Sequence, residues 1–225
     1  MRRSNWNPPG TRSARSRPIG ESIGGGLSTV AENYLKAIYG HTEWQPHPIT
    51  SSQLAARLGS APSSVTEMVK KLTVQGFVEH ALYGTIVLTP RGRAEALRMV
   101  RRHRLIETWL VSEFGYGWDE VHDEAEVLEH VVSDRMIDAI DARLGHPTSD
   151  PHGDPIPGAD GVVPATHGTL LSEIESGESV RVVRISDSDP AVLRLLEGRG
   201  IGVGSRVEPG SVPVEAARAV WVTSV

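Results

Sequence analysis

"ITSSQLAARLGSAPSSVTEMVKKLTVQG", residues 49–76, is the stretch that decides the fold. Thr50 or Ser51 can cap a short helix that Gly59 ends, and the apolar residues between them recur at helical spacing. After a turn of only a few residues, Pro62 begins a second helix that runs to the closing glycine of the stretch. Two helices joined by so tight a turn predict a helix-turn-helix.

The flanking segments extend this unit on both sides. "STVAENYLKAIYG", residues 28–40, follows the plausible cap Ser28 with helical apolar spacing. "FVEHALYGTIVLTP", residues 77–90, predicts two short strands around Tyr83 and Gly84, because glycine can take the positive φ that a tight hairpin needs. Three helices followed by a hairpin are the order of a winged helix.

The remaining chain divides by composition. Residues 1–27 hold five arginines and one acid among Pro, Ser and Gly, which predicts a disordered basic tail. Two long helices are expected at 90–114 and 118–144. Residues 145–164, with five prolines and four glycines, mark a linker, and residues 165–225 read as a small β-rich module. The predicted fold class is mainly α with a small β module.

Composition limits the kinds of site. The 225-residue chain has no cysteine, so thiolate metal sites and cysteine nucleophiles are excluded, and a metal site must use nitrogen and oxygen ligands. No apolar run is long enough to span a bilayer, so a cytoplasmic protein without membrane partners is expected. Residues 50–104 hold nine Arg or Lys against three acids, whereas residues 105–160 hold two against fourteen. This asymmetry suits nucleic-acid binding in the first region and cation binding in the second.

The acidic region carries a candidate metal site. In a helix through "HDEAEVLEH", residues 122–130, the side chains of His122, Glu126, Glu129 and His130 fall within an arc of about 100°. Clustered carboxylates in a partly dry interface repel one another and lose solvation, and a divalent cation relieves both penalties.

The preceding helix repeats the pattern, since His103 and Glu107 interrupt an otherwise apolar stripe. A lone inward histidine is usually a satisfied core residue, but six inward His and Glu residues favour a metal site. Carboxylate and imidazole ligands suit Mn²⁺, Fe²⁺, Co²⁺ or Zn²⁺, and the absence of sulfur ligands favours the harder ions.

At these residues the sequence resembles the diphtheria toxin repressor (DtxR) family of metal-dependent transcriptional regulators, most closely its manganese-responsive, MntR-like branch. The resemblance covers about residues 28–158 and is carried by "AENYLKAIY", "PSSVTEMVKKL", "MVRRHRLIETWL", "EVHDEAEVLEHVVSDR" and "DPHGDPIPG" in the family's order. It implies a homodimer with a winged helix-turn-helix DNA-binding domain at 28–93, a central metal-binding and dimerisation domain at 94–158, and an SH3-like (FeoA-type) domain at 165–225. That last module looks shorter than in full-length relatives.

The resemblance also implies two metal sites. The family's primary site falls on Asn33, Glu126, Glu129 and His130. Glu126 is the manganese-type residue, whereas manganese-type relatives usually carry aspartate at the position of Asn33. The ancillary site falls on His103, Glu107 and His122, with two further ligands expected from the C-terminal module, for which Asp187 and Asp189 are the candidates.

For DNA, the resemblance and the helix-turn-helix pattern agree that residues 62–75 form the recognition helix. The family's groove-facing positions match Ser63, Ser64, Thr66 and Glu67, and phosphate contacts are expected from Lys70, Lys71 and the wing residue Tyr83. Helix capping is an equally good explanation of the two serines.

The sequence thus predicts a repressor, not an enzyme, that binds palindromic double-stranded operator DNA as a homodimer. Mn²⁺, or Fe²⁺, would orient its winged helices and so control metal homeostasis genes. One alternative is a winged-helix factor that needs no metal, its acidic helices serving as a dimer interface. A binuclear metal hydrolase is a weaker alternative, since the sequence supplies no separate base, phosphate loop or oxyanion donor pattern.

Overall fold

The structure, a computed structural model, describes residues 27–44, 47–80, 84–174, 177 and 179–225. The basic tail predicted at the N-terminus lies almost wholly outside these residues, and so does Tyr83. Across the described ranges, none of the helices combines the length and apolarity that crossing a bilayer requires.

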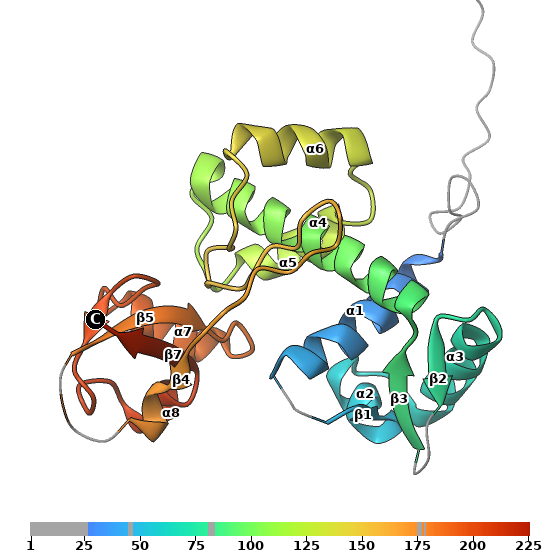
Figure 1. The fold of residues 1–225 in the computed structure, drawn as a ribbon, viewed down its shortest axis with the longest axis horizontal. Helices are drawn as coiled ribbons and strands as arrows, with labels where there is room; N and C mark the ends of the chain where they lie inside the picture. Colours follow the sequence, from blue (N-terminus) through green and yellow to red (C-terminus); the bar gives the residue numbers. More distant parts are fainter. Residues whose placement is uncertain (1–26, 45–46, 81–83, 175–176, 178) are drawn as a thin grey trace, which may run out of the picture.

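The N-terminal unit is the predicted winged helix. It contains α1 (Thr29–Trp44), α2 (Ser51–Arg57), α3 (Pro62–Val74) and the hairpin of β2 (Val78–His80) and β3 (Thr85–Leu88). The two-residue strand β1 (Ile49–Thr50), which the sequence pattern did not predict, completes an antiparallel sheet in the order β1-β3-β2. Figure 1 shows this unit in blue and green, with α3 beside the hairpin.

Local chemistry explains the helix boundaries. Thr50 caps α2 in a capping box with Gln53, and Gly59, after the last turn, takes a φ of 57°. Gly84 in the hairpin has a φ of 76°, as the turn requires. Apolar faces of α1, α2, α3 and the hairpin, together with the first turns of the next helix, form one core. The position of α1 therefore fixes that of α3, the predicted recognition helix.

The second unit contains α4 (Pro90–Phe114), α5 (Val121–Leu128) and α6 (Asp134–Arg143). Helix α4 has the predicted bounds. The single helix predicted at 118–144 is wrong, because the chain leaves the helix after Leu128 and restarts at Asp134.

Arg102 and Ser133 account for this break. The buried Arg102 guanidinium donates to the backbone carbonyl of Glu129 at 2.8 Å and also to that of Val132. Ser133 then caps α6 by accepting from the backbone N–H of Met136. The side chain of a distant residue thus satisfies carbonyls that a continuous helix would have bonded internally.

The C-terminal unit is a four-stranded antiparallel sheet in the order β4-β7-β5-β6, with two short helices and a 3-10 turn. Its apolar side chains form a separate core. In chain order the elements are β4 (Thr169–Leu170), η2 (Leu171–Glu173), β5 (Val180–Ile185), α7 (Pro190–Glu197), β6 (Arg206–Val207), α8 (Val214–Ala217) and β7 (Val220–Ser224). The small β-rich module predicted for this part of the chain is confirmed.

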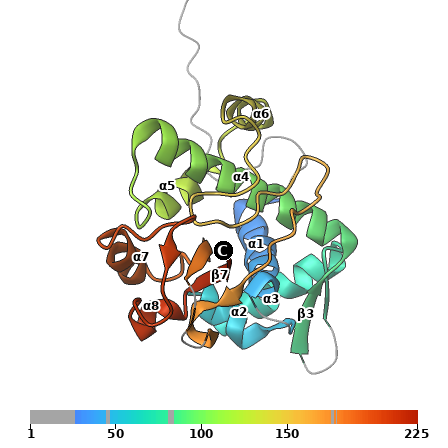
Figure 2. The same ribbon diagram turned by 60° about the vertical axis from the view of Figure 1, so that its left-hand side comes forward.

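The segment "DPHGDP", residues 150–155, fastens this unit to the helical domain. The backbone carbonyl of His152 accepts from the N–H of Ile185 in β5 at 2.8 Å. A Cβ on Gly153, whose φ is 88°, would lie 2.2 Å from the carbonyl oxygen of Val183, so the close approach needs glycine. In Figures 1 and 2 the C-terminal unit is drawn in orange and red, with α4 and α5 running from its side toward α1.

Candidate metal centre

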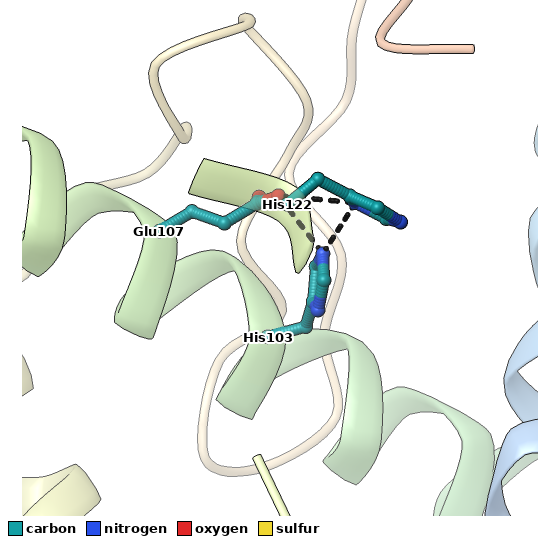
Figure 3. Close-up of side chains that lie close together, drawn as sticks. All are labelled: His103, Glu107 and His122. Atoms are coloured by element: carbon teal, nitrogen blue, oxygen red, sulfur yellow. Dashed lines mark hydrogen bonds and ion pairs between the residues drawn. The ribbon is translucent and has the colours of Figure 1, made fainter. Parts of the chain in front are cut away.

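Two adjacent helices bring three of the predicted metal ligands together. His103 and Glu107 lie one turn apart on α4, and His122 lies in the first turn of α5. The Nε2 atom of His103 is 2.9 Å from Glu107 Oε1 and 3.1 Å from His122 Nδ1, which is itself 3.4 Å from Glu107 Oε1 (Figure 3). One ligand atom from each residue thus lies within 4.8 Å of the others. The predicted ancillary group forms as a compact His–Glu–His cluster.

Two members of this cluster, His103 and Glu107, are buried, whereas His122 is partly exposed. Burial alone opposes protonation of His103, but the neighbouring Glu107 carboxylate outweighs it and raises the pKa of His103 to about 10. Burial likewise opposes ionisation of Glu107, yet His103 and His122 hold the pKa of Glu107 well below its usual range. The cluster holds a proton at neutral pH that a divalent cation would replace, since metal ligands must be deprotonated.

Of the two aspartates considered in the C-terminal unit, one reaches the cluster. Asp187 Oδ2 lies 3.7 Å from His122 Nδ1. Asp189 instead caps α7, its Oδ1 accepting from the backbone N–H of Ala191 at 2.8 Å. The structure therefore brings Asp187 to the predicted ancillary group and leaves Asp189 in a structural role.

Three of the four predicted primary ligands, Glu126, Glu129 and His130, lie close together at and just after the end of α5, with Glu129 in contact with His130 and within ligand distance of Glu126. Glu129 is fully buried, and its Oε1 lies 3.4 Å from His130 Nε2. The other oxygen, Oε2, lies 2.6 Å from His103 Nδ1, so Glu129 touches both predicted groups. Glu126 is about one-third exposed and lies within ligand distance of Glu129 and His103.

Two buried polar atoms in this region are unsatisfied. Asn33 Oδ1, on α1, and His130 Nε2 have no hydrogen-bond partner within the described part of the chain. Most buried polar atoms in folded proteins are paired, so the unpaired Asn33 Oδ1, and His130 Nε2 with its 3.4 Å approach to Glu129, fit a cation as the missing partner. The donor set combines oxygen and imidazole nitrogen from two domains.

Sequence reasoning missed two α1 residues that reach the same place. Lys36 Nζ lies 2.5 Å from Glu126 Oε1 and 2.7 Å from Glu129 Oε1. Glu32 Oε2 lies 2.9 Å from His130 Nδ1, which fixes the orientation of that ring. Lys36 lies three residues after Asn33 and four after Glu32, and this helical spacing was the signal that could have identified Lys36 as a neighbour of the site.

A third missed group surrounds Arg104. This buried guanidinium donates to both carboxylate oxygens of Glu43 on α1, at 2.8 and 3.1 Å, and to the backbone carbonyl of Pro155 at 2.7 Å. Asp150 and Asp154 lie 3.6 and 3.8 Å from it. Burial and the Glu107 charge raise the pKa of Asp150 to about 7.

Asp154 also pairs with Arg184 of β5, so this ionic junction connects all three units. It lies beside a cavity of about 230 Å³ that the predicted metal ligands His103, Glu107, His122 and Asp187 also line.

The predicted recognition helix presents its candidate DNA contacts to solvent. The side chains of Ser63, Ser64, Thr66, Glu67, Lys70 and Lys71 are all exposed on α3. Helix α3 begins after Ala61 without a side-chain cap, so neither serine performs the capping role considered for it. Glu67 pairs with Lys70 at 3.3 Å, which leaves Lys71 as the lysine of this helix with no ion pair in the described region.

Comparisons with known proteins agree with this organisation. Residues 26–86 match the family model "Iron dependent repressor, N-terminal DNA binding domain", residues 89–158 match "Iron dependent repressor, metal binding and dimerisation domain", and residues 169–222 match "FeoA domain". The iron-dependent repressor IdeR of Mycobacterium leprae is 35% identical over 83% of this chain and 86% of its own length. The diphtheria toxin repressor of Corynebacterium diphtheriae is 31% identical over 81% of this chain and 84% of its own.

Solved structures of manganese regulators are also similar. A manganese-dependent transcriptional repressor in complex with manganese shares 45% identity at a TM-score of 0.79, over 87% of this chain and all of that one. The manganese regulator SloR shares 28% identity at a TM-score of 0.70, over 87% of this chain and 98% of its own. The winged helix, the helical domain with its clustered His and Glu residues, and the C-terminal sheet are thus all those of one family, and the chain belongs to the diphtheria toxin repressor family of metal-dependent transcriptional regulators.

Proposed function

We propose that this protein is a manganese-dependent repressor that acts in the cytoplasm as a homodimer on palindromic operator DNA. The observation that carries the proposal is the donor set shared between two domains. Asn33 extends from the DNA-binding domain, whereas Glu126, Glu129 and His130 belong to the dimerisation domain. A cation held by both groups would tie α1, and with it the recognition helix, to the dimer.

The donor chemistry supports Mn²⁺ first. Carboxylate, amide and imidazole ligands without sulfur suit harder divalent ions, with Fe²⁺, Co²⁺ and Zn²⁺ as possible competitors. The identity of 45% with a manganese-dependent repressor supports the same choice, although the curated relatives named above include iron-dependent repressors. We propose His103, Glu107, His122 and Asp187 as the ligands of a second, ancillary ion.

The bound ion would supply positive charge at the junction of the two domains. This chain's own residues supply the coupling, because α1 and α3 share one apolar core and therefore move together. In a homodimer, the fixed domains would hold two recognition helices about 34–36 Å apart, or a multiple of that spacing, as successive turns of the major groove require. Metal thereby selects the DNA-binding arrangement from a wider set of orientations.

Exposed apolar side chains on the helical domain support the homodimer. Val127, Val131 and Met136, around the break between α5 and α6, are 65%, 74% and 43% exposed, and Phe114 at the end of α4 is 61% exposed. Apolar exposure of this kind suits burial against a second copy. Proteins of this family are transcriptional regulators, and the proposal includes no catalytic activity.

Gel shift with DNA from the upstream region of the protein's own coding sequence tests the proposal. Each titration uses Mn²⁺ with wild type, Glu129→Ala, His130→Ala and the matched control Glu124→Ala, whose side chain is exposed on the other face of α5. We expect Mn²⁺-dependent binding by wild type and control and its loss in the other two variants. Unchanged Mn²⁺ dependence in both Glu129→Ala and His130→Ala would refute the primary-site assignment, and metal-independent binding by wild type would favour the metal-independent alternative.

A further inference from the structure

The ammonium group of Lys36 occupies a position among the predicted metal ligands. Its Nζ lies 2.5 Å from Glu126 Oε1, 2.7 Å from Glu129 Oε1 and 3.5 Å from His103 Nδ1. Lysine is rare in this chain, since Lys70 and Lys71 are the other two and the remaining 20 of the 23 basic residues are arginines. Lys36 is therefore the one lysine outside the recognition helix.

The surroundings of Lys36 match the requirements of a small cation. Two of its N–H groups donate to carboxylate oxygens, one of Glu126 and one of Glu129, from the end of α5, and His103 of α4 lies beside them. The group formed by His103, Glu126 and Glu129 has ligand atoms within 4.8 Å of one another, which is the spacing of a metal site. The lysine side chain is 16% exposed, so water screens this charge poorly.

The same contacts connect the DNA-binding and dimerisation domains. Lys36 extends from α1, and the fully buried Glu129 carboxylate needs a positive partner in this interface. Burial would raise the pKa of Glu129, but its hydrogen bond to His103 and the Lys36 charge lower it instead. The two carboxylates proposed to hold Mn²⁺ are thus already engaged by a cation that belongs to the chain.

We propose that Lys36 is a built-in competitor of the metal ion, whose ammonium must leave Glu126 and Glu129 for Mn²⁺ to bind them. Competition weakens metal binding, because like charges a few ångströms apart repel strongly in a poorly screened site. Because of this competition, the protein would bind its operator only above a threshold Mn²⁺ concentration, and Lys36 would help to set that threshold. This inference rests on the proposed function and adds a residue that tunes its threshold.

Isothermal titration of the full-length protein with Mn²⁺ tests the competition. Lys36→Met keeps the length of the side chain and removes its charge, Lys36→Arg keeps the charge, and Lys70→Met removes one charge from an exposed lysine elsewhere. We expect Lys36→Met to bind Mn²⁺ at least about tenfold more tightly than wild type, and the two control variants to stay within about threefold. Equal or weaker binding by Lys36→Met overturns the proposal, and so does equal tightening in Lys36→Arg.

Amine labelling of the wild-type protein gives a second test that requires no variant. With three lysines, the modified peptides are simple to separate, and Lys70 serves as an internal reference. We expect Lys36 to react more slowly than Lys70 without metal, and several-fold faster once Mn²⁺ is added. Reactivity of Lys36 that Mn²⁺ leaves unchanged would show that the ammonium is not displaced.

The two proposals can fail separately. Wild-type protein that takes up no Mn²⁺ refutes the proposed function. Wild-type protein that binds Mn²⁺ and then DNA, while Lys36→Met binds Mn²⁺ no more tightly, refutes only the role of Lys36.

Discussion

Replacing Arg104 by methionine should destabilise the protein more than the loss of any single exposed ion pair would. Its guanidinium bonds both oxygens of Glu43 and lies within 4 Å of Asp150 and Asp154. These three carboxylates are 11%, 2% and 5% exposed. Methionine fills similar volume but leaves buried negative charge with less compensation, a loss that typically costs about 3–5 kcal/mol.

Thermal unfolding of the metal-free protein measures this cost. For a chain of this size, 1 kcal/mol corresponds to a Tm change of about 2–4 °C, so Arg104→Met should lower Tm by about 6–20 °C. Arg143→Met is the matched control, because Arg143 is 69% exposed and water screens its pair with Glu113 at 3.2 Å, so its loss should change Tm little.

The pH dependence of the decrease in Tm shows whether buried carboxylate charge causes it. Without Arg104, the buried carboxyls are stabilised by protonation, and the pKa of Asp150 is already raised to about 7 by burial and Glu107. The difference in Tm between variant and wild type should therefore be smaller at pH 5.5 than at pH 8. A decrease no larger than that of Arg143→Met, or one that is the same at both pH values, would refute the reasoning.

Three further predictions concern protons, ligands and DNA. The pKa of His103 is raised from 6.5 to about 10, so protonated His103 stabilises the fold fully below pH 6.5, and this stabilisation is lost as pH rises through about 10. The variant His103→Gln should therefore show a smaller fall of Tm over that pH range than wild type. An equally steep fall in the variant would count against a raised pKa of His103. Asp187→Ala should weaken binding of a second Mn²⁺ in calorimetry. Asp189→Ala should leave metal binding unchanged but lower the free energy of unfolding by about 1 kcal/mol, because α7 loses its cap. Equal metal affinity in both variants would argue against Asp187 as a ligand. Lys71→Ala should reduce the slope of log K against log salt concentration for DNA binding by about 1, and an unchanged slope would exclude a phosphate contact.

Local signals were enough to predict the winged helix. Cap residues, proline and glycine lie next to the boundaries they determine, so the capping of α2 by Thr50 and the start of α3 at Pro62 were predictable from the sequence. The break between α5 and α6 was not, because Arg102, 27 residues before Glu129 in the chain, takes the carbonyls that end the helix. A helical pattern in one segment contains no information about such a partner.

The candidate site was likewise predictable only where its contacts lie within one helix. Helical spacing placed His103 and Glu107 on one face of α4, and the structure confirms that both are buried there. Lys36 and Arg104 join domains whose relative position depends on the whole fold, so their partners could not be deduced from periodicity. The choice between Asp187 and Asp189 likewise depends on where α7 begins relative to α5.

The most direct test of the central claim uses Asn33, the proposed ligand that the DNA-binding domain contributes. Fluorescence anisotropy of labelled operator DNA, followed as Mn²⁺ is added, compares wild type with Asn33→Ala. If the ion ties the two domains together through this residue, half-maximal binding by Asn33→Ala requires at least about tenfold more Mn²⁺, since even residues that only support metal ligands alter affinity by about 10–100-fold. The same half-maximal Mn²⁺ concentration in both proteins would contradict the account.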